Sequence, residues 1–297
     1  MTLIKSISGI RGTIGGETGD NLTPIDAVKF AAAYGQWLKK ASSKSKLKVV
    51  IGRDARPSGP MIQALVQNTL SGLGIDVIDL GLSTTPTVEM AVVFEKADGG
   101  IILTASHNPV QWNALKLLNE KGEFLNGENG KKILEIAEND DYQFSEVADL
   151  GKVFPKEGLI EKHVEAVLNL PYINVDAIKK ANLKVAVDAV NSTGGIAIPI
   201  LLEKLGVSNA ELLYCEPNGQ FPHNPEPLKE HLGDIMSLMQ EKSCDLGIVV
   251  DPDVDRLALI SENGEMFGEE YTLVICADYL LGKLQGPVVS NLSSSKF

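Results

Sequence analysis

Two stretches of this chain carry the same series of patterns in the same order, and this repetition is the strongest constraint on the fold. LKVVIGRDARPSG (47–59) is similar to LKVAVDAVNSTGG (183–195), and ADGGIILTAS (97–106) is similar to CDLGIVVDPD (244–253). Between these segments, each copy has helical runs and a further short apolar strand. Because strands that alternate with helices are typical of α/β layers, we predict tandem, similar α/β domains with mixed, mostly parallel sheets.

A third copy of the pattern begins near the C-terminus. EEYTLVICADYLLGKLQ (269–285) has the pattern of a helix, and GPVVSNLSSSKF (286–297) resembles the opening strand and loop of the earlier copies. Since the first elements of an α/β unit cannot bury their apolar faces without the rest of the unit, we expect the chain to be a fragment of a longer protein. The predicted domains are residues 1–154, residues 155–266 and an incomplete third domain at 267–297, with LGKVFPKEG as a linker turn at the first boundary.

Composition narrows the class of protein. No apolar run is long enough to cross a membrane, and the N-terminal segment lacks the apolar core of a signal peptide. The net charge of -12 at pH 7 argues against nucleic acid as the main partner. The widely spaced cysteines, Cys215, Cys244 and Cys276, lie in or beside apolar runs, and we expect them to be reduced core residues of a cytoplasmic protein. The oligomeric state is left open by these patterns.

The segment DPDVDR (251–256) carries three carboxylates between two apolar strands. In an extended chain, alternate side chains lie on the same side, so Asp251, Asp253 and Asp255 are predicted to converge. Carboxylates that converge repel one another unless a cation joins them, and oxygen ligands favour Mg²⁺, Ca²⁺ or Mn²⁺ over zinc. We predict Mg²⁺, because it commonly binds to few carboxylates together with phosphate oxygens.

Two alternatives to a magnesium site remain open for this segment. An EF-hand calcium loop matches at Asp251, Asp253, Asp255 and Glu262, but its sixth position requires glycine, where this chain has Arg256. The flanks of an EF-hand loop are helices, whereas the flanks here have the pattern of strands. The second alternative is an acidic turn whose charges are solvated.

TASHNP (104–109) places a serine where an apolar strand gives way to a loop. The Asn-Pro pair that follows disfavours helix, so Ser106 is predicted at the end of a buried strand, a position that often presents functional side chains. Alignment of the two copies places Ser106 opposite Asp253. The serine loop and the carboxylate loop are therefore expected at equivalent points of the two domains.

Three roles are open to Ser106. His107 is adjacent and suggests a hydrolase nucleophile, but neighbouring side chains of an extended chain point to opposite sides, and the glycines of a G-x-S-x-G motif are absent. The serine can instead cap the Asn-Pro turn. It can also carry a phosphoryl group, whose charge of about -1.5 to -2 needs a cation and basic side chains nearby. The candidates are the basic residues of the loop-rich segments: Arg11, Arg53, Arg56, Lys116 and Arg256.

Several motifs together resemble those of the α-D-phosphohexomutase superfamily, which includes phosphoglucomutases, phosphomannomutases and phosphoglucosamine mutases. They are SGIRGT (8–13), GRDAR (52–56), TASHNP (104–109), LK (115–116) and DPDVDR (251–256). The resemblance covers essentially the whole chain. It implies the first two α/β domains of a four-domain protein, followed by the start of the third.

The resemblance also implies roles for individual residues. Ser106 matches the phosphorylated serine, and Asp251, Asp253 and Asp255 match the Mg²⁺ ligands, with the phosphate on the serine as a further ligand. Lys116 and His107 match residues that act in acid/base catalysis and substrate contact, Arg11 matches an active-site arginine, and Arg256 matches the arginine beside the metal ligands. The residues expected to bind the substrate are Arg11, Asn108, Arg53 and Arg256. Proton shuttling by Lys116 requires a pKa that nearby cations lower.

The implied function is that of an intramolecular phosphotransferase, an isomerase of carbohydrate metabolism that interconverts hexose 1-phosphate and hexose 6-phosphate. Phospho-Ser106 gives its phosphoryl group to the sugar, hexose 1,6-bisphosphate forms and turns round, and its other phosphate returns to Ser106. The family's third-domain sugar loop and fourth-domain phosphate loop have no counterpart in this sequence, so we expect this chain to turn over poorly. The identity of the hexose is left open. The alternatives are a Mg²⁺-dependent sugar phosphatase and a non-catalytic phosphosugar-binding module.

Overall fold

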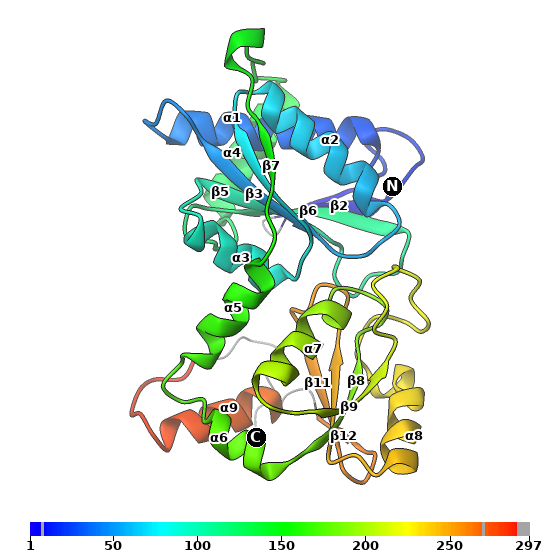
Figure 1. Cartoon of the computed structure of the whole chain (residues 1–297). Helices are drawn as coiled ribbons and strands as arrows, with labels where there is room; N and C mark the ends of the chain where they lie inside the picture. Colours follow the sequence, from blue (N-terminus) through cyan, green and yellow to red (C-terminus); the bar gives the residue numbers. More distant parts are fainter. Residues whose placement is uncertain (7–8, 269–270, 290–297) are drawn as a thin grey trace.

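The computed structural model describes residues 1–6, 9–268 and 271–289, and these form two α/β units in tandem (Figure 1). The strands of the first unit are β1 (Ile4–Ser6), β2 (Gly9–Thr13), β3 (Lys48–Arg53), β4 (Asp76–Leu82), β5 (Gly99–Leu103), β6 (Trp112–Leu118) and β7 (Val153–Pro155). Its helices are α1 (Pro24–Ala41), α2 (Gly59–Gly72), α3 (Thr85–Phe94) and α4 (Gly127–Glu138), with a 3-10 turn at Val147–Asp149.

The second unit follows after two connecting helices. These helices are α5 (Leu159–Leu168) and α6 (Val175–Ala181). The strands of the second unit are β8 (Lys184–Asp188), β9 (Asn209–Leu213), β10 (Leu246–Val250), β11 (Leu257–Ser261) and β12 (Met266–Phe267). Its helices are α7 (Gly194–Lys204) and α8 (Gly233–Lys242), with a 3-10 turn at Lys229–His231, and α9 (Tyr271–Leu281) comes last.

The two sheets share a common arrangement. The strand order is β1-β2-β6-β5-β3-β4-β7 in the first unit and β12-β11-β10-β8-β9 in the second. In each sheet three adjacent strands run parallel, β5-β3-β4 and β10-β8-β9, and the next strand returns antiparallel beside β5 or β10. The prediction of tandem, similar α/β domains with mixed sheets is confirmed. The loops that follow β5 and β10 therefore leave equivalent strands.

Helices cover both faces of each sheet (Figure 1). In the first unit α1, α2 and α4 pack on one face and α3 on the other, and in the second unit α7 and α8 pack on opposite faces. The start of α1 follows from its sequence, because Thr23 and Asp26 form a capping box and Pro24 takes the first position. The alanines at 31–33 are fully buried, so α1 packs closely on its neighbours.

Part of the segment predicted as a linker turn after the first unit is a strand. Val153–Pro155 forms an edge strand that pairs parallel with β4, where a linker turn is expected. The backbone N–H of Val77 donates to Lys152 O at 2.8 Å, so this segment satisfies polar groups that an unpaired edge would leave exposed. The chain then enters α5, which contacts both α3 and α7 and joins the two units.

Of the helix predicted at 269–285, Tyr271–Leu281 forms α9, and residues 269–270 lie outside the described residues. Residues 286–289 lie in no helix or strand, and the remainder of the expected strand and loop, at 290–297, lies outside the described residues.

Cys276 is exposed on α9, so the expectation of a core cysteine is wrong there, because no side chain of that helix is buried. Cys244 is buried, and all three cysteines are free.

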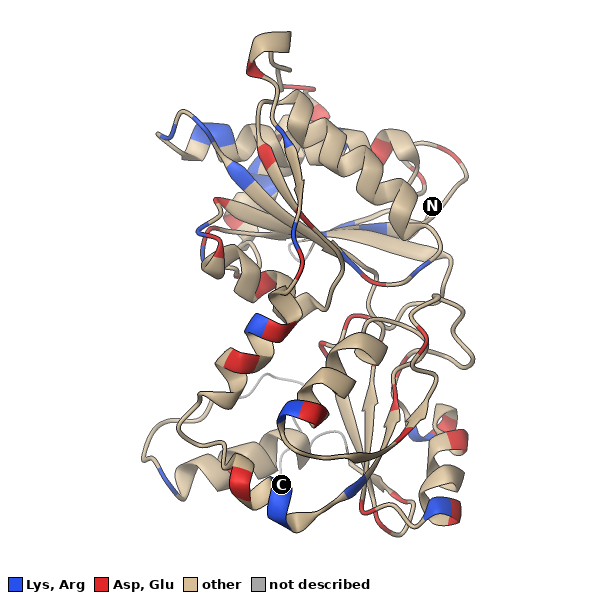
Figure 2. Ribbon diagram, in the orientation of Figure 1, with Lys and Arg blue, Asp and Glu red and all other residues tan. Residues whose placement is uncertain are grey.

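The described part of the chain contains no helix that combines the length and the apolar character needed to cross a membrane. Acidic and basic residues are interspersed over both units (Figure 2).

Candidate active site

Ser106 follows β5 in a tight, well-bonded turn. Its backbone is left-handed, with φ at +51°, and the residue is 9% exposed. Its N–H donates to Thr104 Oγ1 (2.9 Å), and that hydroxyl donates to Asp54 Oδ2 (2.6 Å). The backbone and side-chain amides of Asn108 both donate to Ala105 O, at 3.1 and 2.8 Å. These bonds satisfy the polar groups of the turn and fix the direction of the serine side chain.

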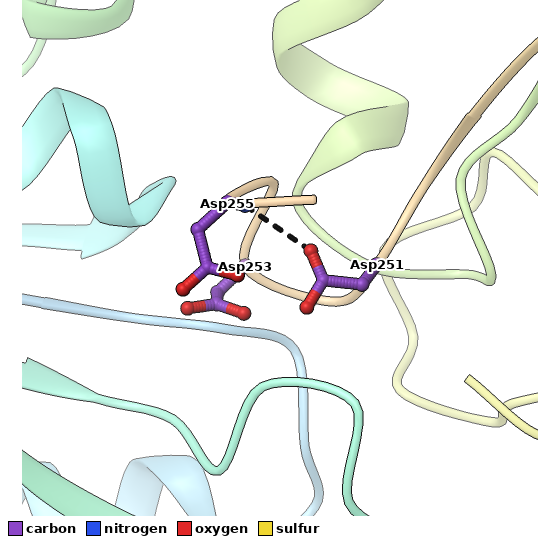
Figure 3. Close-up of side chains that lie close together, drawn as sticks. All are labelled: Asp251, Asp253 and Asp255. Carbon is purple, nitrogen blue, oxygen red and sulfur yellow. Dashed lines mark hydrogen bonds between the residues drawn. The ribbon is translucent and has the colours of Figure 1, made fainter. Parts of the chain in front are cut away.

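The carboxylates of Asp251, Asp253 and Asp255 converge after β10 (Figure 3), with one ligand oxygen of each within 4.8 Å of the others. The chain between them is a turn, with Val254 at φ +62°. Asp251 Oδ1 accepts hydrogen bonds from the N–H groups of Asp255 and Arg256, both at 3.1 Å. A turn, and not the alternation of an extended chain, brings the carboxylates together, which corrects the geometric reason behind the prediction.

The serine loop of the first unit meets the carboxylate loop of the second. Ser106 Oγ lies 2.7 Å from Asp251 Oδ2 and 3.3 Å from Asp255 Oδ1. Lys116 Nζ, from β6, donates to Asp253 Oδ2 (2.7 Å) and to Asp255 Oδ2 (2.9 Å). Side chains that are up to 149 residues apart therefore form one polar cluster between the two units.

Helix α3 also holds the carboxylate loop. The N–H of Thr85 donates to Asp253 O at 2.8 Å, and the Thr85 hydroxyl donates to the Asp253 carboxylate. A helix N-terminus carries unpaired N–H groups and partial positive charge, which stabilise an acidic segment placed there. Asp253 is fully buried, yet its Oδ1 atom has no hydrogen-bond partner among the described residues.

The carboxylate oxygens of this loop are suitable ligands for a hard divalent cation. Burial and the charges of Asp253 and Asp255 raise the pKa of Asp251 well above its usual range. Burial also opposes ionisation of Asp253, but Lys116, together with Thr85 and Asp251, outweighs burial and lowers the pKa of that residue. Carboxylates that repel one another, with one buried oxygen unpaired, are ligands that Mg²⁺ and related cations prefer.

His107 lies on the same side as Ser106, against the prediction that the two point apart. His107 Nδ1 is 3.3 Å from Ser106 Oγ, because the chain at Ser106 is left-handed and not extended. Burial and the charge of Arg256 lower the pKa of His107. The ring is therefore neutral at neutral pH, and one of its nitrogens can accept a proton.

The pKa of Lys116 is shifted in the direction opposite to the prediction. Burial lowers it, but the carboxylates of Asp253 and Asp255 outweigh burial and raise the pKa above its usual value. In this arrangement Lys116 is an ammonium that neutralises the two acids, so the expectation of a depressed pKa is wrong here. Positive charge bound to the same carboxylates would weaken the interaction that causes the increase.

A cavity of about 230 Å³ opens beside Ser106 and brings together most of the predicted site residues. Those on its wall are Arg11, Ser106, His107, Asn108, Lys116 and Asp255. Arg53 and Arg256 do not line it. Arg53 Nε donates to Gln63 Oε1 (2.7 Å), and Arg256 Nη1 lies 3.2 Å from Glu226 Oε1.

Arg56 is a residue whose importance the sequence does not reveal. The sequence offers it only as one of several candidate bases, but the structure buries it completely against Asp54, with 2.8 Å between Arg56 Nε and Asp54 Oδ2. Burial raises the pKa of Asp54 even though Arg56 and Thr104 bind its carboxylate. The Asp-Ala-Arg spacing in GRDAR is the one signal of this pair, and it does not indicate that the pair points inward.

A further polar pair joins the segment after β9 to the end of β8 in the second unit. His223 Nε2 is 3.0 Å from Asp188 Oδ2, and His223 Nδ1 is 2.8 Å from Asn224 O. Burial lowers the pKa of His223, but Asp188, with contributions from Asn224 and Asp234, outweighs burial and raises it above the usual value of 6.5. Both ring nitrogens face acceptors, which favours the imidazolium.

His223→Gln should therefore remove a stabilising contribution that depends on pH. Because the pKa is raised in the folded state, the contribution is fully present below the unfolded pKa of about 6.5 and is lost as pH rises through the folded pKa. We expect the Tm of the wild-type chain to lie roughly 2–4 °C above that of the variant at about pH 5.5, and the two Tm values to be nearly equal at about pH 9. Thermal unfolding followed by circular dichroism measures this, and an equal difference at both pH values contradicts it.

The chain matches two family models at the places where the two units lie. The model of phosphoglucomutase/phosphomannomutase, alpha/beta/alpha domain I matches residues 3–144, and the model of domain II matches residues 161–264.

Known proteins are similar over almost the whole chain. A phosphoglucomutase/phosphomannomutase of Thermococcus kodakarensis is 36% identical over 273 residues, which are 91% of this chain and 59% of that protein. A phosphoglucomutase of Neisseria gonorrhoeae is 31% identical over 94% of this chain and 57% of its own length. The crystal structure of a candidate phosphomannomutase from Thermus thermophilus has a TM-score of 0.82 at 25% identity and covers 95% of this chain and 62% of its own.

The chain spans less than two thirds of the length of each of these relatives. Within that span both family models match in the order of the two units, and the fold agrees. The chain therefore belongs to the phosphoglucomutase/phosphomannomutase family.

Proposed function

We propose that this chain carries out the phosphoryl transfer of a phosphohexomutase, with Ser106 as the carrier of the phosphoryl group. One observation carries the proposal: Ser106 Oγ of the first unit lies 2.7 Å from Asp251 Oδ2 of the second. A phosphate on Ser106 would place anionic oxygens against three carboxylates, and a bound cation makes such an arrangement favourable. A phosphate on Ser106 would thus require a cation nearby, and the three carboxylates beside Ser106 are suited to bind one.

The proposed reaction moves a phosphoryl group twice. Phospho-Ser106 transfers it to a free hydroxyl of a hexose 1- or 6-phosphate: the bond between phosphorus and Ser106 Oγ breaks and a bond to the sugar oxygen forms. The hydroxyl proton passes to a basic group, and Ser106 Oγ takes up a proton to become a hydroxyl. The hexose 1,6-bisphosphate then turns round and returns its other phosphoryl group to Ser106. Transfer of this kind depends mainly on positioning and on stabilisation of charge.

The carboxylate loop would hold the cation. Asp251, Asp253 and Asp255 are the proposed ligands of Mg²⁺, with an oxygen of the Ser106 side chain or of its phosphate completing the set. When bound, the ion supplies neutralisation of charge on the phosphoryl oxygens.

The other cavity residues would bind the substrate and move protons. Arg11 and Asn108 lie on the cavity wall, and we assign them to contact with the anionic sugar phosphate. His107 lies 3.3 Å from Ser106 Oγ, and its lowered pKa leaves it neutral and able to accept a proton. Lys116 is charged in this arrangement and is suited to binding phosphoryl oxygens; its part in proton shuttling stays a prediction.

Arg53 and Arg256 stay predictions for substrate contact, since neither lines the cavity and each contacts another side chain. A cytoplasmic location and a part in carbohydrate metabolism belong to the same proposal.

A single-turnover experiment tests the proposed function. The chain is mixed with Mg²⁺ and glucose or mannose 1,6-bisphosphate, the serine peptides are analysed by mass spectrometry, and the sugar products are separated. Phosphate on Ser106 together with hexose monophosphate supports the proposal, and formation of both the 1-phosphate and the 6-phosphate supports the full cycle, because each form arises by transfer from a different end of the bisphosphate. Inorganic phosphate as the product indicates a sugar phosphatase instead, and bound but unreacted sugar indicates a binding module.

Asp253→Asn is expected to weaken Mg²⁺ binding at least about tenfold, or about 1.4 kcal/mol. Asparagine keeps the shape of the side chain but removes a negative charge and replaces one acceptor oxygen by a donor. Titration calorimetry of the two proteins measures the difference. Asp245→Asn is a matched control, since Asp245 is an exposed carboxylate that accepts the N–H of Lys184. Equal affinity in wild type and Asp253→Asn contradicts the assignment.

A further inference from the structure

Arg56 holds both ends of the serine loop. Its Nε binds Asp54 Oδ2 (2.8 Å), its Nη1 donates to Pro109 O (2.7 Å) and Trp112 O (3.1 Å), and its Nη2 donates to Ser106 O. One buried guanidinium therefore ties the carbonyl of the serine to the point where the chain enters β6. The planar, forked arrangement of its N–H groups allows these bonds to form together, which a lysine could not do.

A segment of the second unit covers this arginine. The segment, residues 214–226, lies between β9 and the 3-10 turn before α8, and we call it the strap. The ring of Phe221 lies over Arg56, with its centroid 5.3 Å from the Cζ atom. Gly219 packs on Ala55 O so closely that a Cβ at this position would lie 2.0 Å from that oxygen, and its φ is +74°. Only glycine fits this contact without displacing the strap.

The strap is fastened to the second unit on both sides of Phe221. The N–H of Gly219 donates to Asn191 O (2.9 Å), and Asn191 Nδ2 donates to Gln220 O (3.0 Å). Beyond the ring, His223 pairs with Asp188, as described above. The position of Phe221 is therefore set by the second unit, although its ring contacts the first.

The end of the strap also reaches the carboxylate loop. Glu226 Oε1 lies 3.2 Å from Arg256 Nη1, and the N–H of Arg256 donates to Asp251 Oδ1 (3.1 Å). The strap thus contacts two arginines. Its Glu226 contacts Arg256, which follows the carboxylates, and its Phe221 contacts Arg56, which anchors the serine loop. The two loops whose meeting defines the site are linked through it.

We propose that Phe221 is a positioning residue: by holding Arg56 from the second unit, it fixes the serine loop of the first unit where Ser106 Oγ meets Asp251. The electron-rich face of the ring attracts the guanidinium and keeps water from its carbonyl contacts. The serine loop is consequently complete only when the two units are docked. The importance of this placement for catalysis rests on the proposed function, because a displacement of about 1 Å can cost up to roughly a hundredfold in rate.

Hydrogen exchange tests the placement itself, independently of any activity. In the full chain, Phe221→Leu keeps an apolar side chain but removes the ring, and we expect the peptide 104–112 to exchange at least about threefold faster than in wild type. Phe221→Tyr keeps the ring and should restore slow exchange. The matched control is Phe94→Leu, which removes a ring that lies 4.6 Å from Lys162 Nζ in a comparable contact away from the site.

The outcomes are distinct. Faster exchange in Phe221→Leu, with wild-type exchange in Phe221→Tyr and Phe94→Leu and in the β3 peptide of all variants, supports the inference. Unchanged exchange at 104–112 in Phe221→Leu overturns it, and so does an equal increase in Phe94→Leu, since that would report general loosening. Because Phe221 is only half-buried and lies in an irregular segment, these variants are expected to fold.

Transfer of phosphate to Ser106 gives a second measurement. With hexose 1,6-bisphosphate, Phe221→Leu should take up phosphate roughly tenfold more slowly than wild type, while its affinity for Mg²⁺ stays the same because no carboxylate is changed. An equal rate of uptake overturns the inference. If the wild-type chain takes up no phosphate, the proposed function fails, and the exchange measurement still decides whether Phe221 positions the serine loop.

Discussion

Ser106→Ala is expected to abolish phosphorylation of this chain by hexose 1,6-bisphosphate while leaving Mg²⁺ binding in place. Alanine has no oxygen to accept the phosphoryl group, and removal of a nucleophile typically lowers a reaction to the level that binding alone supports. The carboxylates of Asp251, Asp253 and Asp255 remain, so metal affinity should change little. Mass spectrometry of the intact chain, and of the peptide that contains position 106, measures the loss.

Two further variants separate the hydroxyl from the backbone at this position. Ser106→Gly also lacks the hydroxyl, but glycine adopts the left-handed conformation at φ +51° without strain, so it should abolish phosphorylation without loosening the turn. Ser237→Ala removes an exposed hydroxyl that binds Gly233 O on α8, and it should be phosphorylated like wild type. Phosphate found on another serine of Ser106→Ala, at the wild-type rate, would exclude Ser106 as the carrier.

The fold could be predicted from the sequence because its patterns repeat. The apolar runs of β3 and β5 have counterparts in β8 and β10, and the structure gives both sets the same order in their sheets. The repetition also predicts that the serine loop and the carboxylate loop leave equivalent strands, but it does not predict that Ser106 meets Asp251 across the two units. Edge strand β7 could not be predicted, because Val153–Pro155 is short and becomes a strand only by pairing with β4.

The details of the site depended on backbone conformations that the sequence does not encode locally. The left-handed residues Ser106 and Val254 turn their loops away from the extended geometry that the pattern suggests. This brings His107 to the serine and draws the carboxylates together by a turn. The pKa of Lys116 depended on which charges lie nearest to it, and Asp253 and Asp255 are brought to it from another domain.

Contacts between the units are the part of the site that sequence reasoning misses most. Phe221 lies in an irregular, proline-rich segment with no periodicity, and nothing in that segment indicates that its ring lies over Arg56, which is 165 positions away in the chain. The side chain of Arg56 gives the same difficulty, because an arginine in a loop is usually solvated, whereas this one is fully buried. Such residues are identified by packing between domains and not by residue type.

Arg56→Met is expected to destabilise the first unit by about 3–5 kcal/mol, because it leaves the carboxylate of Asp54 buried without its cation. The variant also loses the hydrogen bonds to the carbonyls of Ser106, Pro109 and Trp112. Chemical denaturation followed by circular dichroism measures the change in the free energy of unfolding. Arg53→Met is the matched control: Arg53 is partly exposed and binds Gln63 and Asp54 O, and its loss should cost no more than about 1 kcal/mol.

The size of the Arg56→Met effect should depend on pH, because Asp54 can escape the loss of its partner by taking up a proton. Burial already raises the pKa of Asp54 while Arg56 is present, and removal of the cation raises it further. A carboxyl whose folded pKa lies above its unfolded value stabilises the folded state more as pH falls, so the loss of stability in Arg56→Met should be smaller at about pH 5 than at about pH 8.

Asp54→Asn combined with Arg56→Met removes both charges and should be at least about 1 kcal/mol more stable than the sum of the two single losses predicts. Single losses that simply add, with no dependence on pH, would mean that Arg56 acts through packing and not through its charge.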